Sequence, residues 1–277
     1  MSGQLDRLSK YFYEKERTRL NKLRESNEIN GGSSLPVMSK DEIRLCCLEN
    51  DGYESAELND KLYLHFRGYR KIENLDEYTG CKALWLDSNG IETIEGLEKL
   101  EELRCLYLGK NLVNLIQGLD TLVNLSTIDL SYNRITNITN LSCCPNLLTI
   151  NLSRNALSDA DSLRHLIECK SLQSLDVTNN RIDGEGAFEV LVQIPRLSNL
   201  SINGNEITKL PHFRKRFIYQ CSEANENRER VLGYLDRPID EIERLGAAAF
   251  NEGGLEAERE AKAKFREEQQ AKRKNEM

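Results

Sequence analysis

Apolar residues recur along the middle of the chain with a period of 22 residues. Each repeat opens with an apolar pair separated by one residue, and an asparagine follows three positions after the second member of the pair. The pairs begin at Leu62, Leu84, Leu106, Ile128 and Ile150, and two further pairs follow at Leu175 and Leu200, each 25 residues after the pair before it. A regular period of this length predicts a solenoid in which every repeat forms one coil.

The asparagine column is interpreted as structural. After a Leu-x-Leu strand the chain turns inward, so backbone N–H and C=O groups become buried away from water. An asparagine amide, which has two donors and an acceptor, can satisfy them. In the first repeat Arg67 takes this position, which indicates an irregular coil at the end of the array. The repeat asparagines are Asn89, Asn111, Asn133, Asn155, Asn180 and Asn205.

These features are those of the leucine-rich-repeat skeleton. We therefore predict an α/β fold, a leucine-rich-repeat solenoid: a curved right-handed coil with short parallel strands on its concave face and helical caps at both ends. Both leucines of each pair should point inward, with the residue between them facing the concave surface. The two longer repeats have room for outer helices, whose inward side should carry Leu163, Leu166 and Ile167, and Phe188, Leu191 and Val192.

The flanking segments define the expected domain organisation. Residues 1–35 should form a charged helix and linker, 36–60 a cap helix, 61–210 a solenoid of about seven coils, 211–250 a C-terminal cap and 251–277 a charged helical or disordered tail. Ser39 and Glu42 give the cap helix a capping-box signature. The helical run of the C-terminal cap is expected to end in Val231, Leu232, Tyr234 and Leu235, just before Asp236.

Composition narrows the functional classes. The 277 residues carry a net charge of −7, which argues against a general nucleic-acid binder. No apolar run is long enough to predict a membrane span, and the first residues lack a signal-peptide core, so we expect a cytoplasmic protein. The eight cysteines form no C-x-x-C pair and the three histidines are far apart in sequence, so we expect no metal or cofactor and predict buried thiols in a reducing compartment.

No motif predicts catalysis. A phosphate-binding loop, a nucleophile elbow and a zinc-protease motif are all absent from the sequence. The chain is therefore not expected to be an enzyme, and a possible acid cluster is interpreted as a solvated face on loop and outer positions. That cluster consists of Glu92, Glu95, Glu98, Glu101 and Glu102.

The middle residue of each Leu-x-Leu pair is the informative column, because the core does not require it. Aromatic residues fill this column at its N-terminal end, and polar or acidic residues follow. Aromatic residues gathered on a surface are typical of protein-binding hot spots, although they also suit neighbouring strands by packing on one another. The predicted partner-binding residues are Tyr63, Trp85, Tyr107, Asp129, Asn151 and Asp176.

The turns IENL at Ile72 and IEGL at Ile94 resemble the SDS22-like class of intracellular leucine-rich repeats. More specifically, residues 58–91 are similar over their whole length to the first segment of the leucine-rich-repeat dynein axonemal assembly factor family. MSKDEIRLCCLEN ahead of it and the stretch ending in GYLDRPI resemble the same family in the same order, so the resemblance covers about residues 38–250. A single Asp precedes Arg237 where the family usually has an acidic pair.

The resemblance implies a non-enzymatic, protein-binding scaffold required for cytoplasmic preassembly of axonemal dynein arms and hence for a motile cilium or flagellum. It implies a location in the cytoplasm and at the cilium, flagellum or basal body, and partners among axonemal dynein chains and chaperone-type assembly factors. Neither nucleic acid nor membrane is expected as a partner, and the protein is expected to be a monomer. The alternative is an SDS22-like regulatory subunit of a serine/threonine protein phosphatase, which would grip the catalytic subunit with a similar concave face.

Overall fold

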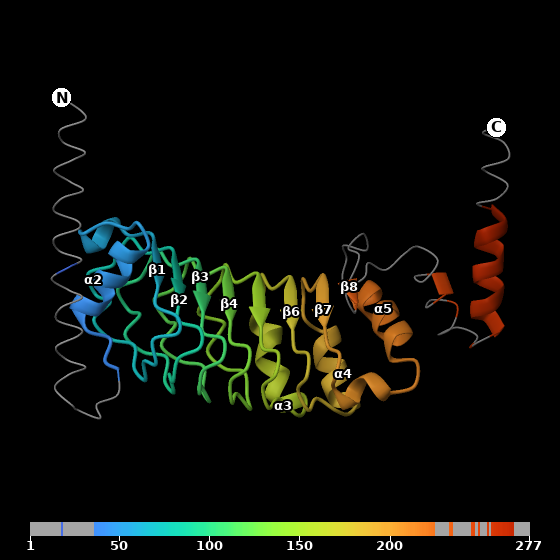
Figure 1. The fold of residues 1–277 in the computed structure, drawn as a ribbon. Helices are drawn as coiled ribbons and strands as arrows, with labels where there is room; N and C mark the ends of the chain where they lie inside the picture. Colours follow the sequence, from blue (N-terminus) through green and yellow to red (C-terminus); the bar gives the residue numbers. More distant parts are fainter. Residues whose placement is uncertain are drawn as a thin grey trace. The chain divides into compact units, whose positions relative to one another are not determined.

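The computed structural model describes residues 36–224, 233–234, 245–246 and 256–268, together with the single residues 18, 249 and 254. The chain forms two compact units, Met1–Ile135 with Thr139–Leu147, and Thr136–Ile138 with Leu148–Met277 (Figure 1). Apart from Thr18, the charged helix and linker expected over residues 1–35 lie outside the described residues.

In the first unit, four short strands pair in parallel and in register. Leu62 lies opposite Leu84, Leu84 opposite Leu106, and Leu106 opposite Ile128. This register follows from the 22-residue period, which returns the chain to the same point of each coil. The strands are β1 (Lys61–Tyr63), β2 (Ala83–Trp85), β3 (Cys105–Tyr107) and β4 (Thr127–Asp129).

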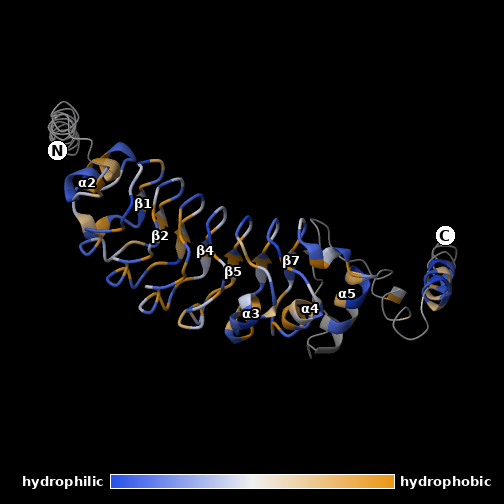
Figure 2. Ribbon diagram, turned by 90° about the horizontal axis from the view of Figure 1, so that it is seen from below, coloured by the Kyte–Doolittle hydropathy of each residue, from blue (hydrophilic) through white to orange (hydrophobic). Residues whose placement is uncertain are grey.

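The core of this unit lies between the strands and the outer turns. In β2, β3 and β4 the middle residue of the strand is buried and its two neighbours are half-buried, which is the predicted inward direction of the first residue of each pair. The second member of each pair is buried as well, as Leu64, Leu86 and Leu108 show. Hydrophobic segments therefore recur once per coil, as the alternation of orange and blue along the ribbon in Figure 2 shows.

The asparagine column satisfies buried backbone groups, as predicted. Asn111 is 4% exposed, and its Nδ2 donates to the carbonyls of Leu86 and Leu108, each at 3.0 Å. Its Oδ1 accepts the backbone N–H of Ile91 at 3.0 Å. One side chain thus joins two successive coils, and Asn89 repeats the pattern one coil earlier.

The N-terminal cap consists of α2 (Lys40–Glu49) and the short helix η1 (Ala56–Leu58). One of the two bonds of the predicted capping box is present, because Ser39 Oγ accepts the N–H of Glu42 at 3.2 Å. The N–H of Ser39 instead donates to the carbonyl of Val37. Arg67 has replaced the repeat asparagine and pairs with Glu49 at 2.8 Å. The irregular residue therefore joins the first coil to the cap.

The second unit continues the repeat with helices on its outer side (Figure 1). Its strands are β5 (Thr149–Asn151), β6 (Ser174–Asp176), β7 (Asn199–Ser201) and β8 (Gly233–Tyr234), which pair in parallel in that order. Its helices are α3 (Ala160–Leu163), η2 (Arg164–Glu168), α4 (Glu185–Val192), η3 (Glu206–Lys209) and α5 (Phe213–Ala224).

Three details of this unit differ from the sequence prediction. The helical run predicted through Tyr234 is wrong, because Gly233–Tyr234 pairs with β7 as a strand. Ile167 and Val192 are half-buried rather than fully inward. The helix α4 instead buries Ala187 and Val190 beside Phe188 and Leu191. Sequence spacing places the apolar stripe on the correct side, but the rotation of a short helix is fixed by packing.

The helix α5 covers the end of the second unit through aromatic packing. Phe213 and Phe217 are stacked with their ring centroids 5.8 Å apart, and both meet the ring of Phe188 edge-on. All three side chains are buried. Arg216 of α5 also forms two bonds to Glu185 of α4 and lies over the ring of Phe188. Apolar burial and this ion pair therefore both hold α5 against α4.

Candidate protein-binding surface

The three aromatic residues of the predicted row stack on one another on the exposed side of the first unit. The ring centroids of Tyr63 and Trp85 are 4.6 Å apart with an interplanar angle of 20°, and those of Trp85 and Tyr107 are 5.2 Å apart at 15°. In-register pairing places these residues opposite one another on β1, β2 and β3. All three side chains are half-buried, so the stack presents part of its area to solvent.

Two further rings extend this stack, and the sequence reasoning missed them. His65 meets Tyr63 edge-on at 6.3 Å, and Phe66 meets His65 edge-on at 5.4 Å. Phe66 is 72% exposed and has a φ of 57°, a region that bulky side chains seldom adopt. We call these five residues, Tyr63, His65, Phe66, Trp85 and Tyr107, the aromatic surface.

Phe66 occupies a turn position that recurs in each coil. The residues at the same point of the next coils, Ser88, Lys110 and Tyr132, also have positive φ angles. This column is a turn position in which glycine, asparagine or another polar residue is the usual choice. The positive φ is thus a feature of the turn in every coil, and what Phe66 adds is a ring that is 72% exposed.

Two carboxylates border the aromatic surface, Asp129 beyond Tyr107 and Asp87 two residues after Trp85 in the preceding coil. Asp129 follows Tyr107 in the row, and its Oδ1 accepts the backbone N–H of Ser131 at 2.8 Å. Asp87 Oδ1 accepts the N–H of Gly109 at 3.0 Å. Burial raises the pKa of Asp87, and the nearby charge of Asp129 raises it further, while hydrogen bonding to Gly109 opposes this shift. Carboxylates therefore lie both beside the middle of the aromatic row and beyond its last ring.

The polar residues of the row in the second unit have local roles. Asn151 Oδ1 accepts the backbone N–H of Ser153 at 3.0 Å and its hydroxyl at 2.8 Å. Asp176 Oδ1 accepts the backbone N–H of Thr178 at 2.8 Å. Both side chains are half-buried at the predicted strand positions. Each thus stabilises the turn that follows its own strand, and a role in partner binding stays a prediction for both.

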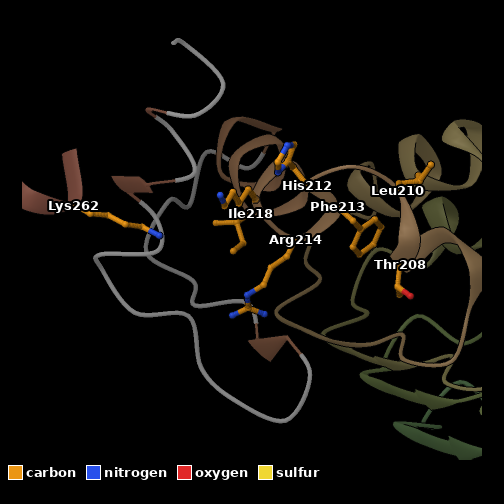
Figure 3. Close-up of a pocket in the computed structure, with 8 residues that line it drawn as sticks. Thr208, Leu210, His212, Phe213, Arg214, Ile218 and Lys262 are labelled. Atoms are coloured by element: carbon orange, nitrogen blue, oxygen red, sulfur yellow. The ribbon is translucent and has the colours of Figure 1, made fainter. Parts of the chain in front are cut away.

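A pocket of about 300 Å³ lies beside α5 in the second unit. Its lining includes the basic residues His212, Arg214, Lys215 and Lys262 and the apolar residues Phe213 and Ile218 (Figure 3).

Glu258 forms ion pairs with two of the four basic side chains that line this pocket. It is 6% exposed, pairs with Lys262 at 2.8 Å and also contacts Lys215. Burial raises the pKa of Glu258, but its bonds to the two lysines outweigh this and lower the pKa below its usual range. We therefore assign the pocket to packing between α5 and the helix at 256–268.

The predicted acidic face is exposed, and three of the thiols are buried. The five glutamates of the predicted solvated face are all exposed. Cys46, Cys47 and Cys81 are buried, and burial raises their thiol pKa values to about 11, 11 and 12. Within the described residues, no group of three or more His, Cys, Asp or Glu side chains could hold a metal ion, and no helix is long and apolar enough to cross a membrane.

Comparison with known proteins agrees with the fold. A leucine-rich repeat family model matches residues 120–234. A solved internalin from Listeria monocytogenes superposes with a TM-score of 0.53 at 22% identity, covering 70% of this chain and 59% of the internalin. The fold is thus a leucine-rich-repeat solenoid, and identity at this level carries no information on function.

Comparison with sequences confirms the resemblance to the dynein assembly factors. A 51-residue segment is 49% identical to human dynein axonemal assembly factor 1, covering 18% of this chain and 7% of the human protein. A 65-residue segment is 45% identical to the homologue from Drosophila pseudoobscura, covering 24% of this chain and 4% of that protein. The aligned segments span less than a tenth of the length of either relative.

Proposed function

We propose that this chain is a non-enzymatic, protein-binding scaffold that takes part in the cytoplasmic preassembly of axonemal dynein arms. The observation that carries the proposal is the 49% identity to dynein axonemal assembly factor 1 over 51 residues. The leucine-rich repeats alone would not carry it, since the same solenoid serves many unrelated partners.

The aromatic surface is the part of the molecule that we assign to client binding. Tyrosine and tryptophan bury a large area at a small loss of side-chain entropy, so they dominate the binding energy of many interfaces. Mutual stacking already restrains Tyr63, Trp85 and Tyr107. Less rotamer freedom is therefore lost on binding, and a client meets a preformed surface.

The test is genetic rescue in a flagellated cell that carries this gene. Deletion should leave axonemal doublets without outer or inner dynein arms in electron micrographs of cross-sections, and the unaltered gene should restore them. A Trp85→Ala/Tyr107→Ala double variant should be folded and fail to restore the arms. Tyr53→Ala is the matched control, because Tyr53 is an aromatic residue outside this row with 60% exposure, and it should restore the arms fully.

Two results would contradict the proposal in different ways. Normal arms after deletion would remove the assembly function, and a pull-down of a phosphatase catalytic subunit would then test the regulatory-subunit alternative. Full rescue by the folded double variant would keep the assembly function but move the client site away from the aromatic surface.

A further inference from the structure

The three stacked rings of the aromatic row present mainly their edges to a partner. Trp85 lies between Tyr63 and Tyr107, with ring centroids 4.6 and 5.2 Å away and interplanar angles of 20° and 15°. Both faces of the indole are therefore covered, and each tyrosine has one face covered by Trp85. Because the edge of an aromatic ring carries partial positive charge, the row favours a partner that brings negative charge or the face of another ring.

The indole N–H of Trp85 adds a hydrogen-bond donor to this surface, since indole can donate but not accept. Within the part of the chain that the structure describes, the side chain of Trp85 makes ring contacts and no hydrogen bond. Its N–H is also not among the described polar groups that are buried without a partner. The donor is therefore open to solvent, and an acceptor of a partner can reach it.

Three basic side chains border the row where the strands begin. Lys61 is the first residue of β1, two positions before Tyr63, so strand alternation places both on one face. Lys82 and Arg104 directly precede β2 and β3. They lie on neighbouring coils, because the N–H of Arg104 donates to the carbonyl of Lys82 at 2.8 Å. We call Lys61, Lys82 and Arg104, all of which are exposed, the basic border.

The basic border has no intramolecular counter-ion in contact with it. Two exposed carboxylates lie close in the chain, Asp60 before Lys61 and Glu102 two residues before Arg104. Among the described residues, however, no ion pair engages any of the three cations. By contrast, Asp87 and Asp129 accept backbone N–H groups. The basic border therefore offers charges that the fold itself leaves unused.

We propose that the aromatic row and the basic border together bind an acidic segment of the client protein, in which carboxylates flank apolar or aromatic side chains. This rests on the proposed function for the identity of the client and deepens it by naming the chemistry that is recognised. Carboxylates form charge-assisted hydrogen bonds with Lys82 and Arg104. An aromatic side chain of the client meets the edges of the row with its face.

Single-stranded nucleic acid is the other class of partner that combines aromatic rings with basic side chains. Bases bind by stacking on open ring faces, and both faces of Trp85 are covered. A phosphate backbone also needs a basic track that continues along the protein. Here Ser126 follows Arg104 on the next coil, and Asp129 follows Tyr107. The short basic border therefore fits a few carboxylates better than a run of phosphates.

The sole tryptophan of the chain gives a direct assay, because Trp85 lies in the middle of the row. The probes are the peptide acetyl-GSEEFEEGS-amide, its counterparts with glutamine or lysine in place of glutamate, and a short single-stranded thymidine oligonucleotide. Each is titrated into the full chain while Trp85 fluorescence is recorded. The glutamate peptide should give a saturable change with an affinity at least about tenfold tighter than the glutamine peptide. The lysine peptide and the oligonucleotide should give none.

Reversing the charge of the basic border is the sharper test. The Lys82→Glu/Arg104→Glu variant should lose the glutamate peptide and bind the lysine peptide instead, a reversal that a merely structural defect would not produce. Lys99→Glu is the matched control, because Lys99 is an exposed lysine in the turn before β3, and it should change neither affinity. Circular dichroism of every variant verifies folding.

Equal binding of the glutamate and glutamine peptides, no saturable binding, or tighter binding of the oligonucleotide would each overturn the acidic-segment assignment. Unchanged binding of the glutamate peptide by the folded charge-reversed variant would do the same. These outcomes are independent of the rescue experiment. Loss of dynein arms on deletion, without selective peptide binding, would keep the proposed function and remove the acidic chemistry of the client. Selective binding by a protein whose deletion leaves the arms intact would keep the surface and remove the client assigned to it.

Discussion

Replacing Asn111 with alanine should destabilise the first unit strongly. The change removes two bonds from Nδ2 to the carbonyls of Leu86 and Leu108 and one bond from the N–H of Ile91 to Oδ1. Asn111 is 4% exposed, so the N–H of Ile91 is left buried without its acceptor. The carbonyls of Leu86 and Leu108 each lose one bond but still accept from Asn89 and Asn133, respectively. A buried, unsatisfied N–H costs about 1–3 kcal/mol and each lost bond to a carbonyl about 0.5–1.5 kcal/mol, and relaxation recovers part of this, so we expect a loss of about 2–4 kcal/mol in the free energy of unfolding.

Asn124→Ala is the matched control. Asn124 is exposed, and its Nδ2 donates to one carbonyl, that of Glu101 at 3.0 Å. Water can replace this bond, so the free energy of unfolding should fall by less than about 1 kcal/mol. Both variants belong to the same unit as Trp85, so its fluorescence during urea unfolding reports their stability directly.

A small difference between the two variants would refute the reasoning. If Asn111→Ala lost no more stability than Asn124→Ala, water must enter the coil and satisfy the freed groups. The asparagine column would then be a preference of the turn and not the element that joins one coil to the next.

Three further perturbations follow from the structure. The raised pKa of Asp87 means that the folded state holds the proton of this carboxyl more tightly than the unfolded chain does, so stability is lost as the pH rises through the folded-state pKa. Asp87→Asn should therefore be more stable than the wild type at pH 7. Urea unfolding should show no difference between the two well below pH 4, where the carboxyl is protonated in both states. Iodoacetamide at pH 8 should modify the half-buried Cys105 in the native protein and spare Cys46 and Cys81 until urea exposes them, as peptide mass spectrometry would detect. Glu49→Gln removes one charge of the partly buried ion pair, 2.8 Å long, that joins α2 to the first coil, and should lower the free energy of unfolding by about 1 kcal/mol in the same fluorescence assay.

Much of the fold could be predicted because its buried positions repeat. The paired leucines and the asparagines recur at the same point of each coil, so the repeat period identifies them in the sequence. The leucines fill the core, and the asparagines satisfy buried backbone groups. Tyr234 could not be placed in the same way. Its strand has two residues, and only pairing with β7 defines it.

The site was harder to predict than the fold. The stack of Tyr63, Trp85 and Tyr107 follows from the period alone, because in-register strands bring equivalent residues together. Phe66 lies in a column with no constant residue type, so the repeat pattern did not predict that it belongs to the aromatic surface. The carboxylates of Asp87 and Asp129 are positioned by hydrogen bonds to the backbone of Gly109 and Ser131, which no sequence pattern encodes.

The spacing of the strands also restricts the shape of a client. Neighbouring strands lie about 4.8 Å apart, whereas an α-helix advances about 5.4 Å per turn. A client helix lying along the row would therefore fall out of step by about 0.6 Å at each coil. Between Tyr63 and Tyr107 the accumulated offset is only about 1.2 Å, small enough for side chains to absorb. Over a longer run the turns of the helix would lie opposite the gaps between strands. The three-residue aromatic stack is therefore short enough for a straight helix to match the spacing of the strands along its whole length.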